Sequence, residues 1–311
     1  MGIFSSLFGG NKTPEENKAK NFDILKYDGI RAMNIGKLTY AIKCFEEATA
    51  IQEDIETLQH QANCYTRVNR LDDARTLLVR ITELAPEQPL TFHALASLCY
   101  IQEDYKGMDE ACQKALALDA DNASTYFLAA KAAIGLSNGI QAIAMLTKAI
   151  VLNDQFTEAY QLRAEVLWAM RQPKDAEADV DKLLEMNPED ESALLMKAEM
   201  LIVGGNEEEA VRLMGEVLAL NPFCEKAYLL KGNYLLAKKE YDAAISVYDE
   251  ALEINPNFAQ AYHERGRAKL AKGDKQGSME DMKLAIEMAP EQGAAITGEY
   301  NNFEQQKNIP F

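Results

Sequence analysis

Apolar and small residues recur at helical spacing along this chain, and the pattern is clearest between residues 225 and 258. Residues that share one face of a predicted first helix are Tyr228, Gly232 and Leu235, and those of a second helix are Ala244, Tyr248, Ala251 and Leu252. Pro256 is expected to stop the second helix, because proline lacks the amide hydrogen that continues it. The stretch therefore predicts two helices joined by a tight turn.

The same pattern returns at an interval of 34 residues. If the stretch 225–258 is numbered from 1 to 34, further copies cover 22–54 (one residue shorter), 55–88, 89–122, 123–156, 157–190, 191–224 and 259–292. Position 8 is always small, and in chain order it is Gly29, Ala62, Ala96, Ala130, Ala164, Ala198, Gly232 and Gly266. Short side chains at this position let two helices approach to about 8–10 Å. The periodicity predicts a stack of eight helical hairpins.

This pattern resembles the tetratricopeptide repeat, which carries a large residue, a small residue and Tyr on its first helix, then Ala, an aromatic residue and Pro. The resemblance covers residues 22–292, although Trp never occupies position 4 and position 24 is aromatic only at Phe45 and Tyr248. It implies an all-α fold, a right-handed superhelical solenoid of paired antiparallel helices. We expect residues 14–292 to form a single solenoid, because each repeat contacts only its neighbours.

The two ends fall outside the repeats. Thr13 and Pro14 form a good helix start, with Thr13 as N-cap. The first helix should therefore begin near Pro14 and exceed its counterparts in length. Beyond the last repeat, residues 293–311 resemble part of a further first helix followed by a loose tail, which could cover the exposed face of the last hairpin.

Residues 1–13 are expected to be a flexible apolar segment. Their apolar stripe consists of Ile3, Phe4, Leu7 and Phe8. The stripe is too short for a membrane span and has no basic residue ahead of it, as a signal peptide would. Three interpretations stay open: an unimportant start, a candidate anchor on a membrane or partner, and a lipidated terminus, since Met1-Gly2 with Ser6 matches the myristoylation pattern.

Charge and cysteine content restrict the partners and the compartment. The chain has 49 acidic and 32 basic residues and a net charge of −17, which disfavours nucleic acid and anionic membranes as partners of the repeats. Its five cysteines are scattered, without a CxxC pair, which is typical of a reducing compartment. We expect a cytoplasmic protein that touches a membrane, if at all, through its N-terminal segment.

The sequence contains no recognisable catalytic or metal-binding constellation. His60, His93 and His263 lie in different repeats and have no second His or Cys at i+3 or i+4. The prediction is a protein that is not an enzyme and that needs no cofactor or metal.

The resemblance implies instead a binding groove, because first helices of the family line its concave face through positions 2, 5, 9, 12 and 13. The candidate partner-binding residues at these positions are Leu90, His93, Tyr100, Phe127, Lys131, Ile134, Gln161, Glu165, Trp168, Leu195, Glu199, Ile202, Leu229, Asn233 and Leu236. Position 12 is apolar in seven of the eight copies and includes Trp168, the only Trp of the chain. Large aromatic residues in a central, concave place are typical interface anchors. The alternative is that position 12 packs against the neighbouring first helix as ordinary core.

A known groove chemistry of the family can be tested on these residues. Some members grip a terminal carboxylate with Lys and Asn at set positions of three consecutive repeats. Lys26 takes the first of these positions, but Ile30 occupies the place of the Asn, and no other three repeats supply the set. We therefore do not expect a carboxylate clamp.

The prediction for function is a non-catalytic scaffold or adaptor that binds a segment of another protein in the groove. The alternative is a peripheral membrane assembly protein tethered by the N-terminal stripe. Self-association through the outer faces or an end of the stack also stays open.

Overall fold

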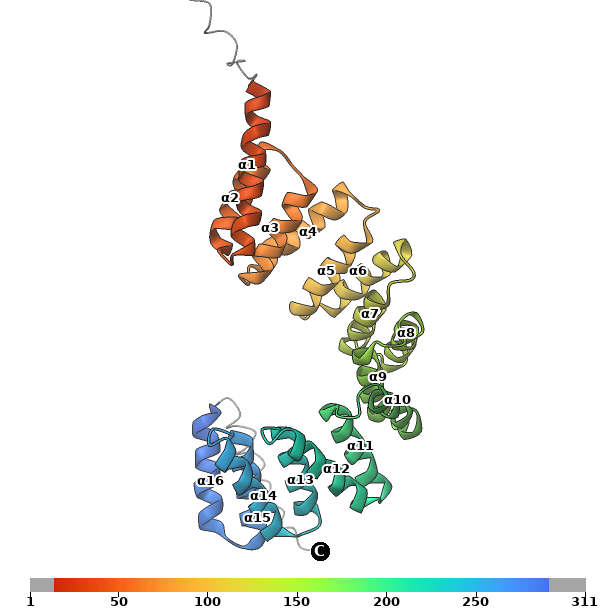
Figure 1. Ribbon diagram of the computed structural model, residues 1–311, viewed down its shortest axis with the longest axis vertical. Coiled ribbons are helices and arrows are strands. Elements are labelled where there is room, and N and C mark those ends of the chain that lie inside the picture. Colours follow the sequence, from red (N-terminus) through yellow and green to blue (C-terminus); the bar gives the residue numbers. More distant parts are fainter. Residues whose placement is uncertain (1–13, 291–311) are drawn as a thin grey trace, which may run out of the picture. The chain divides into compact units, whose positions relative to one another are not determined.

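The computed structural model describes residues 14–290, and within them every regular element is a helix (Figure 1). In chain order the helices are α1 (Pro14–Asn34), α2 (Leu38–Ile51), α3 (Ile55–Arg67), α4 (Leu71–Leu84), α5 (Pro89–Ile101), α6 (Tyr105–Leu118), α7 (Ala123–Gly135), α8 (Gly139–Leu152), α9 (Thr157–Ala169), α10 (Pro173–Met186), α11 (Glu191–Gly204), α12 (Glu207–Leu220), α13 (Glu225–Ala237), α14 (Tyr241–Ile254), α15 (Ala259–Lys272) and α16 (Lys275–Met288). The predicted all-α fold of paired helices is confirmed.

Helix limits follow the repeat frame. The stretch 225–258 holds α13 and α14, and α14 ends at Ile254, two residues before Pro256. The predicted long first helix is also confirmed, since α1 starts at Pro14 and has 21 residues. Thr13, the N-terminal stripe and the predicted C-terminal cap lie outside the described residues.

The helices form two compact units. One contains α1 to α9 and ends at Met170, and the other begins at Arg171 and contains α10 to α16. Within each unit, helices that follow one another along the chain pack side by side. The boundary falls inside the predicted repeat 157–190, so a single continuous solenoid over 14–292 stays a prediction.

Close helix contacts explain the small residues at position 8. A Cβ added to Gly232 would lie 2.3 Å from the ring of Tyr248 on α14, which is fully buried. A Cβ on Gly29 would lie 2.5 Å from the ring of Phe45, which is equally buried. In both hairpins an aromatic side chain of the second helix occupies the space that a larger residue on the first helix would need.

The turn inside each hairpin has a residue with positive φ at the same repeat position. Position 15 adopts a positive φ in all eight copies, at Gly36, Asn69, Glu103, Ser137, Arg171, Gly205, Lys239 and Gly273. In the hairpin of α5 and α6, the amide of Glu103 donates to the carbonyl of Tyr100 and that of Asp104 to the carbonyl of Cys99. This is the Schellman pattern, which satisfies the last carbonyls of the first helix and fixes where the second helix starts.

Candidate functional site

Helices α5 and α7 of the first unit expose large apolar side chains that the repeat frame assigns to the groove. Leu90 is 71% exposed, Tyr100 42% and Ile134 37%. Ile101, which follows Tyr100 at position 13, is 53% exposed. Exposure at this level means that these four side chains are not core residues of the first unit.

Three predicted groove residues come together where α5 packs beside α7. The Nζ of Lys131 lies 4.6 Å from the ring centroid of Tyr100 and 4.9 Å from that of Phe127. Both distances are within the range of a cation–π contact. Phe127 also packs on Phe156, with 5.0 Å between ring centroids, so the loop before α9 supports its ring. We call Tyr100, Phe127 and Lys131 the Lys131 cluster.

His93 lies on α5 as a half-buried, uncharged neighbour of this face. Its Nδ1 is 3.0 Å from the hydroxyl oxygen of Thr125 on α7. Burial lowers the pKa of His93 below its ordinary value, because desolvation disfavours the charged ring. His93 is therefore neutral at pH 7 and adds no second positive charge beside Lys131.

Helix α9 supplies the other predicted residues of the first unit. Trp168 and Gln161 are half-buried, whereas Glu165 is exposed and accepts a hydrogen bond of 3.1 Å from the Gln161 amide. Within residues 14–290, no ring contact links Trp168 to the Lys131 cluster. Trp168 thus stays a predicted anchor that is only partly open to solvent.

In the second unit the predicted apolar residues pack largely as core. Leu195 is 7% exposed and belongs to the core between α11 and α12, so it offers almost no surface to a ligand. Ile202 packs against the same core, and Leu229 and Leu236 pack against the core around Tyr248. The alternative interpretation of position 12, ordinary packing, fits Ile202 and Leu236 better than a groove does.

The predicted polar residues of the second unit are exposed. The side-chain oxygen of Asn233 accepts a hydrogen bond of 2.9 Å from the hydroxyl of Tyr248. Desolvation raises the pKa of Glu199, although the nearby charge of Lys226 opposes the shift. The role of Asn233 and Glu199 in binding stays a prediction.

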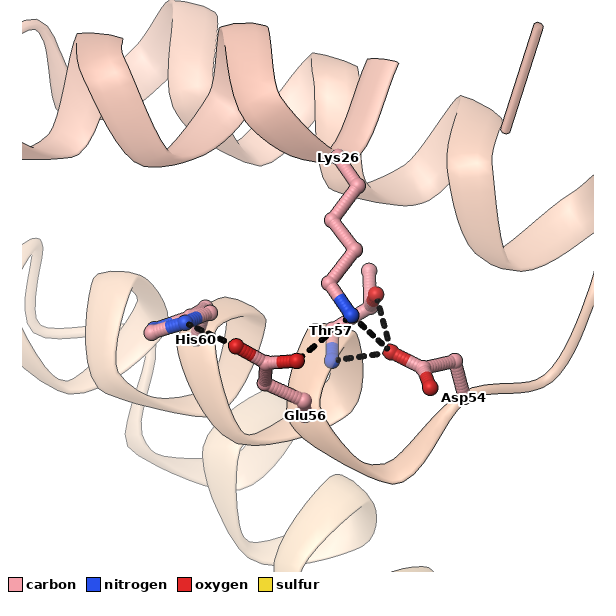
Figure 2. A network of polar contacts seen from close by, with 5 residues as sticks. All are labelled: Lys26, Asp54, Glu56, Thr57 and His60. Carbon is pink, nitrogen blue, oxygen red and sulfur yellow. Dashed lines mark hydrogen bonds and ion pairs between the residues drawn. The ribbon is translucent and has the colours of Figure 1, made fainter. Parts of the chain in front are cut away.

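Figure 2 shows why Lys26 cannot act as a clamp residue. Its Nζ lies 2.9 Å from a carboxylate oxygen of Asp54 and 2.6 Å from one of Glu56, and Glu56 is also 3.7 Å from His60. Asp54 also accepts hydrogen bonds from the amide and hydroxyl of Thr57, and Asp54 thereby caps the start of α3. Two carboxylates of the chain already occupy this lysine, so the ammonium ties α1 to the start of α3.

Sequence reasoning missed partly buried ion pairs between second helices and the first helices beside them. Arg265 on α15 bonds to Asp281 on α16 and to Asp249 on α14, each at 2.6 Å, and Lys269 lies 2.8 Å from Asp281. On α11, Lys197 lies 2.8 Å from Asp181 of α10 in the same way. The sequence did contain a signal for these ion pairs. In both cases a basic residue at position 7 of one copy follows an acidic residue at position 25 of the preceding copy.

Neither a metal site nor a membrane span is evident in the part of the chain that the structure describes. No group of three or more His, Cys, Asp and Glu side chains there could hold a metal ion. None of its helices combines the length and apolar character needed to cross a bilayer. An open hollow of about 520 Å³ lies near the turn between α1 and α2, and its lining consists of Asp28, Arg31, Ala32, Ile35, Lys37 and Tyr40. It includes no predicted groove residue.

Comparison with protein-family models identifies repeats of one kind in the chain. A model described as TPR repeat matches residues 232–273, and models described as tetratricopeptide repeat match residues 167–234 and 259–292. A search of curated protein sequences finds no match.

Solved structures with the same fold come from several organisms. A tetratricopeptide repeat protein from Parabacteroides merdae is 21% identical, with a TM-score of 0.65, over 76% of this chain and 93% of that one. Yeast Tom70 is 18% identical, with a TM-score of 0.61, over 99% of this chain and 67% of Tom70. Pseudomonas aeruginosa pilF is 13% identical, with a TM-score of 0.57, over 70% of this chain and 99% of pilF. At these identities the likeness concerns the fold.

Proposed function

Because this chain is a tetratricopeptide repeat protein, we propose that it is a non-catalytic scaffold that binds a segment of another protein on the inner face of its first helices. The observation that carries the proposal is the group of exposed apolar side chains on α5 and α7 beside the Lys131 cluster. A stack of helical hairpins presents such a face to extended or helical segments.

Physical reasoning favours a protein partner for this face. Leu90, Tyr100, Ile101 and Ile134 would bury apolar area on binding, and each fully buried large side chain is worth about 1.5–3 kcal/mol. Aromatic side chains such as Tyr100 are common anchors of interfaces. The net charge of −17 supports a protein rather than nucleic acid. We place the partner on α5, α7 and α9, with Trp168 at the edge of the contact.

The compartment is part of the same proposal. Cys44, Cys64, Cys99 and Cys112 are buried free thiols, and Cys224 is half-buried. Thiols used as small core residues fit a reducing cytoplasm.

The proposal is tested by quantitative pull-down from the source cell's lysate. Tyr100→Ala and Trp168→Ala each remove a proposed anchor, and truncation of an interface anchor costs about 2 kcal/mol or more. We expect the same proteins to be lost or strongly reduced with both variants. Ile140→Ala is the matched control, since Ile140 is 74% exposed on the second helix α8. Identical protein profiles for all four baits would reject the inner face as the binding site.

A second candidate function is peripheral membrane assembly through the apolar stripe of Ile3, Phe4, Leu7 and Phe8. Its support is the amphipathic spacing of the stripe, which would place four apolar side chains on one face of a helix. Deletion of residues 1–10 should then abolish co-flotation with liposomes. Equal flotation of the deleted and full-length chains, or none for either, would remove this candidate.

A further inference from the structure

Helices α5 and α7 are almost free of charge in a highly charged protein. Their sequences, PLTFHALASLCYI and ASTYFLAAKAAIG, contain Lys131 as the single Asp, Glu, Lys or Arg residue. In the whole chain these four residue types make up 26%. The neighbouring first helices differ, since α3 carries Glu56 and Arg67, and α9 carries Glu158, Arg163 and Glu165.

Lys131 itself has no anionic partner within residues 14–290. Its half-buried ammonium lies over the rings of Tyr100 and Phe127. Contacts with ring faces are worth about 0.5–1 kcal/mol at exposed sites. The rings hold the ammonium in place on an apolar face. Among the described residues this lysine lacks an acidic partner, although the chain has 49 Asp and Glu residues and a net charge of −17.

We propose that α5 and α7 recognise an apolar segment of a partner protein that carries a single Asp or Glu side chain. The carboxylate pairs with Lys131, and the apolar side chains around it pack on Leu90, Tyr100, Ile101 and Ile134. This inference rests on the proposed function, and it names the chemistry of the segment that this face selects. It differs from a terminal-carboxylate clamp, which needs several donors from three repeats.

The single cation of α5 and α7 favours a segment with one acidic group. Glu165 on α9 is exposed on the first helix that follows α7, whereas Glu56 on α3 is already paired with Lys26. A carboxylate placed beside Glu165 would be repelled, whereas a carboxylate over Lys131 meets the only cation of α5 and α7. A phosphate group or a run of acidic residues would need more than one cation, so an isolated Asp or Glu flanked by apolar residues fits best.

The test starts from a library of random 12-residue peptides displayed with their C-termini fused to the carrier, so that no free C-terminal carboxylate is offered. Peptides selected on the full chain are synthesised in amidated form and titrated by fluorescence anisotropy. The baits are the wild type, Lys131→Met, Tyr100→Ala and the control Ile140→Ala. Circular dichroism establishes that each variant keeps its helicity.

We expect the selected peptides to share one Asp or Glu among apolar residues. Replacing it by Asn or Gln should weaken binding about tenfold, and Lys131→Met should do the same, as expected for a partly desolvated charge pair. The two changes together should weaken binding no more than either one alone. A second selection on Lys131→Glu should replace the acidic residue by Lys or Arg.

The outcomes separate this inference from the proposed function. Peptides that lose affinity with Tyr100→Ala but bind Lys131→Met as tightly as wild type overturn the carboxylate inference and leave the scaffold intact. Selection that yields no peptide, or only peptides indifferent to Tyr100→Ala, overturns the proposed binding face and the inference with it.

Discussion

Single residues at positions 8 and 24 of the repeat are matched in size. Gly29 faces Phe45 and Gly232 faces Tyr248, and in each pair the ring occupies the space where a Cβ would lie. Copies with Ala at position 8 carry smaller partners, as in Ala130 with Leu146. The sequence contains part of this relation, because two of the three copies with glycine at position 8 carry an aromatic residue at position 24, whereas Gly266 faces Met282. Only the structure shows that the ring and the glycine touch.

Gly232→Ala should lower the free energy of unfolding by about 1–3 kcal/mol, since the added methyl group overlaps a rigid buried ring. Urea unfolding followed by circular dichroism measures the loss. Adding Tyr248→Leu recreates the Ala–Leu combination of Ala130 and Leu146. The double variant should therefore lose less stability than the sum of its two single changes, and strict additivity would contradict the size match.

A second prediction about single residues follows from backbone conformation alone. Gly273 has a φ of +104° and Gly215 lies inside α12, and a Cβ on either would meet no atom within 4 Å. Gly273→Ala should destabilise the protein by about 1 kcal/mol or more, because L-residues avoid that conformation. Gly215→Ala should stabilise it by about 0.5–1 kcal/mol through helix propensity. Thermal unfolding compares the two, and shifts of the same sign would rule out this account.

At the scale of elements, polar side chains link neighbouring first helices to one another. The repeat pattern alone does not predict these contacts. Asp54 caps α3 and also holds Lys26 of α1. Burial raises the pKa of Asp54, but the hydrogen bonds from Thr57 and Lys26 outweigh it, so its pKa is lower than usual. The repeat frame did not predict this link, because Lys26 and Asp54 are unrelated by repeat position and meet only once α1 and α3 are packed.

Asp54→Asn keeps an N-cap side chain but removes the charge that Lys26 needs, so it should destabilise the first unit at pH 7. A carboxyl with a lowered folded-state pKa stabilises the fold above its unfolded pKa of about 3.9 and loses this effect as the pH falls through the folded value. Chemical unfolding at pH 7, 5 and 4 measures the difference between variant and wild type. That difference should be complete at pH 7 and 5 and begin to shrink near pH 4. Glu87→Gln is the control, because Glu87 is exposed and has no ion pair within residues 14–290.

Across the whole molecule, the sequence predicted the helices and their pairing. It did not predict which side chains at a given repeat position are exposed. Ile134 and Leu236 occupy the same repeat position, yet Ile134 is exposed and Leu236 packs against a core. Phe127 and Leu195 likewise share position 5, and only Leu195 is buried. A repeat position fixes the direction of a side chain on its own helix. It does not fix the distance to the next helix, which depends on the neighbouring side chains.

The same limit explains the Lys131 cluster. Sequence reasoning placed Tyr100, Phe127 and Lys131 separately along the groove, with Trp168 as the central anchor. Packing of α5 beside α7 brings the first three together, and Trp168 is half-buried without a ring contact to them. The centre of the candidate site therefore lies on α5 and α7.

Site-specific photo-crosslinking tests the central claim, binding on the inner face of the first helices, most directly. A photoreactive amino acid is placed at Ile134 on α7 or, as the matched control, at Ile140 on α8, both of which are exposed. After illumination in the source cell's lysate, the account predicts discrete crosslinked partner proteins from position 134 and none of them from position 140. The same partners from position 140, with none from position 134, would contradict it.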